Sequence, residues 1–392
     1  MGITCLSYTG SQARVWYTQK PDPPSLGVVQ TGSTPCGRLF AMSSTGSSTG
    51  PSTGPSTVPH PLRRITVLSG GVGGARFLQG LLHGIATGAL PGVSHDAEVT
   101  VIANTGDDWW VHGLKICPDL DTVMYTLGDG IDHDRGWGRR NETWHAKDEL
   151  ASYGVEPTWF GLGDRDLATH LVRTQMLDAG YPLSQVTEAL CRRWKPGITL
   201  LPMTDDRVET HVAITDPEAA SGRRVVHFQE YWVKLRAEVP AEALVFVGLD
   251  DSSPAPGVID AITDADLVIV PPSNPVVSVG TILGVPRVRE AMAATRARVV
   301  GLSPIVGGHH LRGMAEQLLT TIGVEVSAAG VGLHYGARND GGLLDGWLVD
   351  VADTDGVRRV VDAGLPCRAV PLLMTDLGAT AAMAAAAVEL VA

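Results

Sequence analysis

The chain has 392 residues, 44% of them hydrophobic and 18% charged, which predicts an ordinary globular protein long enough for more than one lobe. Its formal net charge is −12, and the residues from 61 onward carry about −14, so it should repel nucleic acid and anionic membranes. The sequence shows no signal peptide, no apolar run near the roughly 18 residues of a membrane span, and no Cys/His metal spacing, so we expect a cytoplasmic protein.

The first segment, residues 1–60, does not read as folded. It contains the repeat SSTGSSTGPSTGPST and offers little apolar surface to offset the entropy of ordering. We therefore expect a disordered tail that takes no part in the fold.

Apolar strands alternate with amphipathic helices in two parts of the remaining chain, residues 61–130 and 241–392. This alternation predicts an α/β core with a Rossmann-like, mostly parallel sheet. Residues 131–240 between them hold five of the nine tryptophans, two helical stretches and then β-like segments. We interpret this middle segment as an inserted, partly helical lid or second lobe.

The stretch LSGGVGGARFLQGLLHG, residues 68–84, joins the first apolar strand to a helix. A dinucleotide fingerprint counted from Gly71 would continue through Gly73 but meets Arg76 where the third glycine belongs. No Gly-Lys-Ser/Thr follows, so the Walker pattern fails as well. We predict a phosphate site of another kind, formed by Gly71, Gly73 and Gly74 with Arg76 as a fixed charge. The alternative is a tight turn without a ligand.

The second strand ends in a loop rich in acidic and amide side chains. Asn104, Asp107 and Asp108 come directly after the strand, and Asp119 and Asp121 follow closely. Ligands of open α/β sheets collect at the carboxyl ends of strands, and grouped carboxylates suit Mg²⁺. We predict metal binding by Asp107, Asp108 and Asp121 and substrate binding by Asn104. The alternative is solvated turn aspartates plus a helix N-cap at Asp119 or Asp121.

Two later strand-end loops have a similar composition. The first carries Ser273, Asn274 and Ser278, and the second carries Ser303, Gly307, Gly308 and Arg312. Three such loops together indicate a nucleotide with a pyrophosphate, although each alone could be a helix cap.

Aromatic and polar residues are mixed in the middle segment, a combination that suits a flat heteroaromatic ligand. The candidates are Trp137, Arg139, Trp144, Lys147, Asp164 and Arg165. For each tryptophan the alternative is burial in the core.

Several of these motifs, in this order, resemble those of one family. ITVLSGGVGGARFLQGL, ANTGDDWWVHGLKICPDLDTVMYTLGDG, RGWGRRNETW, WFGLGDRDLATHLVRT, LPMTDDRVETHV, FQEYWV, PPSNPVVSVGTIL and LSPIVGG resemble the 2-phospho-L-lactate transferases, the CofD/FbiA-type enzymes of coenzyme F420 biosynthesis. The resemblance covers about residues 63–392. The forms GGVGGARFL and SPIVGG are similar to the actinobacterial branch, whose donor is the enolpyruvyl compound. His309-His310-Leu311-Arg312 departs from the lysine-containing stretch that often follows SPIVGG in relatives.

The resemblance implies transfer of a phosphoenolpyruvyl or 2-phospho-L-lactyl group from a guanosine-diphosphate-linked donor to the deazaflavin Fo. GMP leaves, a phosphodiester forms, and Mg²⁺ is required. It implies that the glycine turn and the 271–280 loop hold the donor, and that Lys147 and the lid hold Fo. Asp107 and Asp108 would hold Mg²⁺ and orient the ribityl hydroxyl of Fo, and Asp108 would accept or orient its proton. The family also suggests a homodimer.

Two other functions are alternatives to this one. Gluconeogenesis-factor-like proteins share the glycine turn and an Asp-Asp loop, and they bind nucleotide sugars and regulate rather than catalyse; the aromatic lid favours the transferase. A dehydrogenase is disfavoured by the broken dinucleotide fingerprint. The choice between a lactyl and an enolpyruvyl donor stays open.

Overall fold

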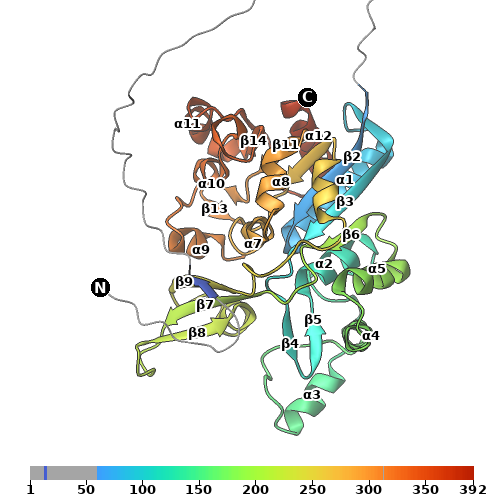
Figure 1. Ribbon diagram of the computed structural model, residues 1–392, viewed down its shortest axis with the longest axis vertical. Helices are drawn as coiled ribbons and strands as arrows, with labels where there is room; N and C mark the ends of the chain where they lie inside the picture. Colours follow the sequence, from blue (N-terminus) through green and yellow to red (C-terminus); the bar gives the residue numbers. More distant parts are fainter. Residues whose placement is uncertain (1–12, 16–59, 312) are drawn as a thin grey trace, which may run out of the picture. The chain divides into compact units, whose positions relative to one another are not determined.

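The structure is a computed structural model that describes residues 13–15, 60–311 and 313–392 (Figure 1). The predicted disordered tail, residues 1–60, therefore lies almost wholly outside the described residues, and Arg312 lies outside them too. Within the described part of the chain, no helix has both the length and the apolar composition needed to cross a membrane.

A parallel sheet of seven strands forms the core and confirms the predicted α/β, Rossmann-like class. Its spatial order is β15-β14-β11-β10-β2-β3-β6, and every neighbouring pair is parallel. The strands are β2 (Leu62–Ser69), β3 (Val93–Ala103), β6 (Thr199–Pro202), β10 (Leu267–Val270), β11 (Arg298–Leu302), β14 (Gly346–Val349) and β15 (Cys367–Ala369). From β2 the chain first builds outward through β3 and β6, and then returns to place β10 on the other side of β2. The direction of strand order therefore reverses between β2 and β10, which is where such sheets bind ligands.

Side chains of the central strands are buried alternately on the two faces of the sheet. In β2, Ile65 and Val67 belong to one apolar cluster and Leu68 to the other. In β10, Ile269 belongs to the cluster of Ile65 and Val67, and Val268 belongs to the cluster of Leu68. Because both faces are covered, these strands appear in the sequence as continuous apolar runs rather than alternating ones.

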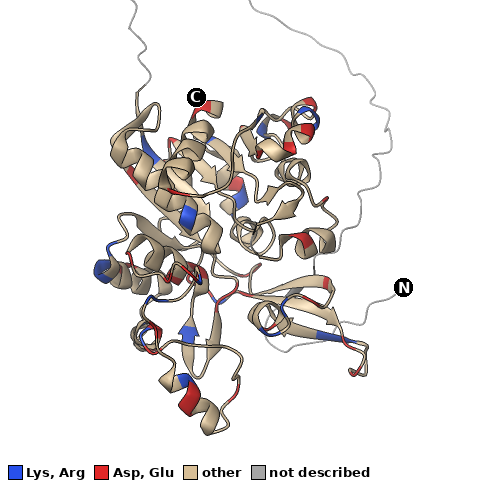
Figure 2. Cartoon of the chain, turned by 180° about the vertical axis from the view of Figure 1, so that it is seen from behind, with Lys and Arg blue, Asp and Glu red and all other residues tan. Residues whose placement is uncertain are grey.

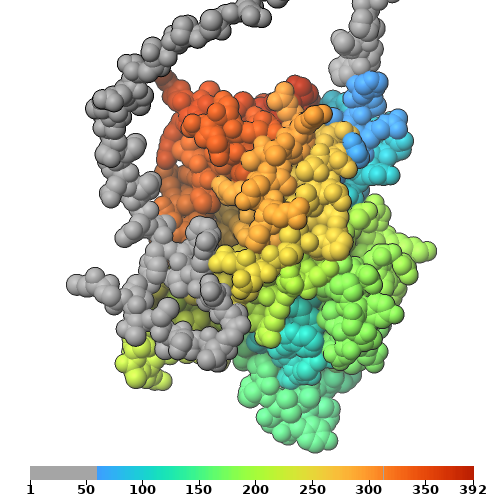
Figure 3. Space-filling view, in the orientation of Figure 1, coloured from blue at the N-terminus to red at the C-terminus, as the bar shows by residue number. Residues whose placement is uncertain are grey.

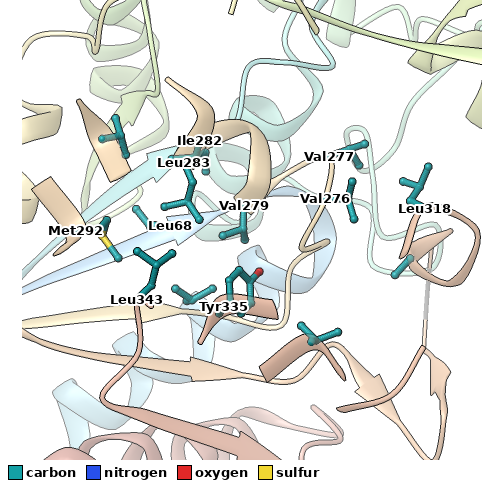
Figure 4. Close-up of a cluster of buried hydrophobic side chains, with 14 of the residues drawn as sticks. Leu68, Val276, Val277, Val279, Ile282, Leu283, Met292, Leu318, Tyr335 and Leu343 are labelled. Carbon is teal, nitrogen blue, oxygen red and sulfur yellow. The ribbon is translucent and has the colours of Figure 1, made fainter. Parts of the chain in front are cut away.

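Helices cover both faces of the sheet. One cluster contains side chains of α1 (Gly71–Thr87), α2 (Pro118–Leu127), α5 (Leu183–Trp194) and α12 (Leu377–Val391). The other contains side chains of α6 (Val258–Thr263), α7 (Val279–Gly284), α8 (Val288–Ala294), α9 (Ala315–Thr321), α10 (Ala328–Tyr335) and α11 (Val357–Asp362). Figure 4 shows part of this second cluster, in which Leu68 of β2 lies near Val279 and Leu283 of α7.

The middle segment, residues 131–240, contains the helices α3 (His145–Ser152) and α4 (Asp166–Asp178) as well as α5. Its later part forms β7 (Glu209–Thr215) and β8 (Arg223–His227), which join β9 (Ala241–Val247) and β1 (Ala13–Val15) in a small antiparallel sheet. The hairpin of β4 (Trp109–Val111) and β5 (Leu114–Ile116) projects with α3 from the seven-stranded part (Figure 3). The same segment also supplies β6, an edge strand of the central sheet, so it is not wholly separate from the core. The division into a core and a lid stays a prediction.

Three glycines allow the β2–α1 turn and the loop after β10 to pack against each other. A Cβ on Gly70 would come 2.2 Å from Cβ of Ser278, and one on Gly73 would come 2.5 Å from the carbonyl oxygen of Pro272. A Cβ on Gly74 would come 2.8 Å from Oγ of Ser273 and 2.1 Å from Oγ of Ser69, the last residue of β2. The glycines therefore bring the two loops together at the reversal point of the sheet.

We expect Gly73→Ala to lower the free energy of unfolding by about 1–3 kcal/mol, because the added methyl group would overlap a backbone oxygen that cannot rotate away. Urea unfolding measures the effect. Arg76→Ala, at an exposed position of the same helix, is the control and should change the value by less than about 0.5 kcal/mol. Equal stability of both variants would contradict this close packing.

Candidate active site at the carboxyl ends of the strands

The glycine turn lies at the carboxyl end of β2, and the protein's own side chains already bond to two of its N–H groups. The backbone N–H of Gly70 donates to Oγ of Ser273 at 3.2 Å, and that hydroxyl donates back to the Gly70 carbonyl at 3.0 Å. The N–H of Gly71 bonds to the Asp119 carboxylate. Gly71 has a φ of 50°, a conformation that favours glycine. Hydrogen bonds within the protein therefore join the turn to the loop after β10 and to the first turn of α2.

In the two other loops predicted to bind anions, backbone N–H groups also donate to side chains of the protein. Asn274 accepts hydrogen bonds from the N–H groups of Val276 and Val277 at 2.9 and 3.2 Å, as in an Asx turn. The N–H groups of Gly307 and Gly308 donate to the Asp353 carboxylate at 2.9 and 3.2 Å.

An acidic pair lies beside the glycine turn. The side-chain amide of Asn104 donates to Oδ1 of Asp107 at 3.1 Å and to Oδ2 of Asp119 at 3.0 Å, so one nitrogen holds both carboxylates. Both aspartates are buried. Burial raises the pKa of Asp119 to about 7, and the pKa of Asp107 is raised well above its usual range by burial and by the charges of Asp119 and Asp108. The pair is therefore a place where positive charge would be stabilised.

Asp108 differs from Asp107 in its surroundings. Its side chain is fully buried, and Oδ2 lies 3.2 Å from Nζ of Lys115 on β5. Burial raises the pKa of Asp108, and the nearby ammonium partly opposes this. For Lys115, burial acts to lower the pKa, but the Asp108 carboxylate outweighs it and the pKa lies above its ordinary value. The two groups thus form a buried ion pair.

Asp121, predicted as a metal ligand, forms an ion pair with Arg173 of α4. Both residues are buried, and His170 Nδ1 lies 3.8 Å from the same carboxylate. His170 continues the network to Asp166, whose Oδ2 is 3.3 Å from Nε2. The guanidinium already balances the Asp121 charge, so binding a cation there would compete with this pair. Within residues 13–15, 60–311 and 313–392, no group of three His, Cys, Asp or Glu side chains is arranged to hold a metal ion.

Residues of β7, of β8 and of the segment just after β8 contact the loop that carries Asp107 and Asp108. The carboxamide of Gln229 donates to the backbone oxygen and to Oδ2 of Asp107, both at 3.2 Å. His227 Nε2 lies 3.3 Å from the Asp108 carbonyl, and the N–H of Thr210 donates to the Gly106 carbonyl at 2.5 Å. Burial lowers the pKa of His227 to about 4, so it is neutral at pH 7.

An aromatic cluster lies next to the acidic loop. The Trp109 ring stacks on His227 with centroids 5.1 Å apart, and it contacts Trp159 and Phe160 at 5.4 and 5.0 Å. The predicted aromatic residues Trp137 and Trp144 contact each other instead, at 6.4 Å. The tryptophan ring nearest to the acidic loop in the chain is therefore Trp109, which the motif analysis did not select.

The other candidates from residues 131–240 mostly make contacts within that segment. Asp164 accepts hydrogen bonds from the N–H groups of His145 and Ala146 and so caps α3. Arg139 donates to the carbonyl of Arg165 at 2.7 Å and covers the Trp194 ring at 5.0 Å. Lys147 differs, because it lines a small pocket with Phe160, Leu162 and His112.

Sequence reasoning missed four polar residues of this region, Lys115, Arg173, His227 and Gln229. Lys115 stands in the same motif as the aspartates, and Gln229 stands in FQEYWV, so both were in view without a reason to select them. Figure 2 shows that acidic and basic positions are both present around the hairpin and the small sheet.

Comparisons with known proteins agree with one another. The family model for "2-phospho-L-lactate transferase CofD" matches residues 65–363. A phosphoenolpyruvate transferase from Streptomyces coelicolor is 63% identical over 327 residues, which cover 83% of this chain and 98% of that protein. One from Nocardia farcinica is 59% identical over 327 residues, covering 83% and 94%. The solved structure of a UPF0052 member from Bacillus halodurans has a TM-score of 0.50 at 18% identity, covers 83% of this chain and 99% of that one, and shows the fold.

We expect Arg173→Met to destabilise the fold by about 3–5 kcal/mol, because Asp121 would be left buried without its partner. Chemical unfolding measures the loss. The double variant Arg173→Met/Asp121→Asn should recover part of it. Arg192→Met removes an exposed ion pair with Glu188 and should cost less than about 1 kcal/mol. A cost for Arg173→Met no greater than for Arg192→Met would disprove the pairing.

The pKa of Asp119 predicts a pH dependence of stability. The folded protein keeps this proton up to about pH 7, whereas the unfolded chain loses it near 3.8, so the contribution is complete at low pH and is lost as the pH rises through 7. Asp119→Asn should therefore gain stability relative to the wild type between pH 5 and 8. Urea unfolding in EDTA at several pH values tests this. A difference that does not change with pH would refute the raised pKa.

Proposed function

The chain belongs to the CofD family of 2-phospho-L-lactate transferases, and we propose that it transfers a phosphoenolpyruvyl or 2-phospho-L-lactyl group from a guanosine-diphosphate-linked donor to the deazaflavin Fo. One observation carries the proposal within the family. Asn104 holds the carboxylates of Asp107 and Asp119 together beside the glycine turn, at the point where strand order reverses. The chain also covers almost the whole length of its transferase relatives.

The donor site is supported by the packing of the β2 and β10 loops. The first turn of α1 offers its positive dipole end there, and Arg76 is exposed one turn further along the helix. Ser273 and Ser278 lie directly against Gly70. We assign this edge to the donor's phosphates and guanosine, with Asn274 shaping the loop.

The residues present fit Mg²⁺. Asp107 and Asp119 are buried carboxylates held by one amide; burial and neighbouring carboxylate charges raise the pKa of each, and a cation would offset both effects. Asp107, with Asp119 beside it, would hold the ion, and Asp108 and Asp121 are already paired with Lys115 and Arg173. When bound, the ion offsets the negative charge of the donor's phosphates.

The proposed chemistry needs no protein nucleophile. The acceptor hydroxyl attacks the phosphorus that carries the enolpyruvyl or lactyl group, a P–O bond forms, and the P–O bond to GMP breaks. Asp107 accepts the hydroxyl proton. This role was predicted for Asp108, but the complete burial of Asp108 and its pairing with Lys115 make Asp107 the better candidate.

The acceptor site is supported by the aromatic cluster of Trp109, Trp159 and Phe160, and Lys147 lies close to Phe160. Flat aromatic faces next to the Asp107–Asp108 loop suit a planar heteroaromatic ring. Trp137 and Arg165 remain candidates for the same site, and we also propose a homodimer and a cytoplasmic location.

Mass spectrometry of the products from Fo plus each donor, with Mg²⁺ or with EDTA, tests the proposal. We expect the phosphodiester and GMP from one of the donors, and no product in EDTA. Asp107→Asn should lower kcat by about 10²-fold or more. Asp205→Asn is a matched control, because Asp205 caps α5 through Ser184; its kcat should stay close to wild type. Absence of product with both donors would refute the function, and binding of nucleotide sugars without turnover would favour the regulatory alternative.

A further inference from the structure

We propose that Gln229 is a positioning residue for the transfer reaction, and that its carboxamide fixes the orientation of the Asp107 carboxylate. The inference rests on the proposed function, because it assigns Gln229 a role through the residue that accepts the proton. Gln229 is 122 residues away from Asp107 in the chain and is buried, with 5% of its surface exposed.

The two oxygens of Asp107 each have one amide donor. Asn104 donates to Oδ1 at 3.1 Å, and Gln229 donates to Oδ2 at 3.2 Å. Donors on both oxygens determine the plane of the carboxylate, whereas one donor would leave it free to rotate. Because Gln229 is buried, water cannot readily take over its hydrogen bond. Polar partners of this kind orient the carboxylates that perform chemistry.

The backbone of the loop is held by the same segment. The N–H of Gln229 donates to Nδ1 of His227 at 3.1 Å, so Nδ1 is an acceptor and the proton of the neutral ring is on Nε2. That Nε2–H then donates to the Asp108 carbonyl at 3.3 Å. The Gln229 carboxamide also donates to the Asp107 carbonyl at 3.2 Å. We call these two residues the His227–Gln229 clamp; it holds two consecutive carbonyls and one carboxylate.

The position of the clamp relates it to the chemistry. It consists of the last residue of β8, in the small sheet, and a residue just beyond it, whereas Asp107 follows β3 in the central sheet. The ring of His227 also stacks on Trp109, which belongs to the aromatic cluster. One short segment therefore contacts both the proton-accepting loop and the surface proposed for the acceptor. The clamp therefore helps to set the position of the Asp107–Asp108 loop relative to the aromatic cluster.

Gln229→Met tests the inference, because methionine fills nearly the same space and donates no hydrogen bond. We expect kcat to fall by about 10- to 100-fold, with the KM of both substrates little changed. Gln229→Glu keeps the size but places an acceptor against Oδ2 of Asp107, so the loss should be greater. Tyr231→Phe is the matched control: it removes a buried hydrogen bond from the same segment, to the Val239 carbonyl, without touching Asp107. It should leave kcat near wild type.

Two further measurements separate positioning from general destabilisation. In an Asp107→Asn background, Gln229→Met should add little further loss of kcat, because its effect passes through the Asp107 carboxylate. Hydrogen exchange of peptides covering residues 104–109 should be faster in Gln229→Met than in Tyr231→Phe. A wild-type kcat for Gln229→Met, an additive loss in the Asp107→Asn background, or unchanged exchange would overturn the proposal. The exchange result needs no turnover, so it stands even if the wild type gives no product and the proposed function fails.

Discussion

The buried Asp119 carboxylate is the interaction on which the geometry of the site depends. It accepts hydrogen bonds from the side chain of Asn104, which follows β3, and from the backbone of Gly71, which begins α1. Asp119 itself lies in the first turn of α2. Three segments are thereby held at one point, and Asn104 extends the arrangement to Asp107. Burial disfavours the charged form of this carboxyl group and raises its pKa to about 7.

The fold could be predicted because it follows from local patterns, and the same patterns lead to the proposed place of the site. Strands buried on both faces give apolar runs such as residues 65–68 and 267–270, and the alternation with helices gives a parallel sheet. In such a sheet all strand-end loops meet at one edge, so the glycine turn and the aspartate loop had to lie together. The phosphate site at the glycines stays a prediction, and their observed effect is to let two loops touch.

The roles of individual side chains could not be predicted, because they depend on partners far away in the chain. The sequence predicts Asp121 as a metal ligand, and it does not show that Arg173, 52 residues away, pairs with this carboxylate. It predicts Asp164 as a substrate ligand, and it does not show that Asp164 caps α3. Gln229 stands in the motif FQEYWV, but a glutamine there has no typical chemistry by which to select it. The spacing of residues along a sequence predicts helices and strands, but it does not predict which charged group will lie beside a given carboxylate.

The edge strand β6 has a consequence for how freely this protein can vary. The segment that carries α3, α4 and α5 returns to the sheet at Thr199–Pro202 and pairs with β3 before it continues into the small antiparallel sheet. A segment anchored in this way is not a module that can be exchanged as a whole. Removing it would strip the backbone pairing from one side of β3, which precedes Asn104 and Asp107. Residues of the projecting part near α3 can therefore vary more freely, whereas residues of β6 can change only together with the site.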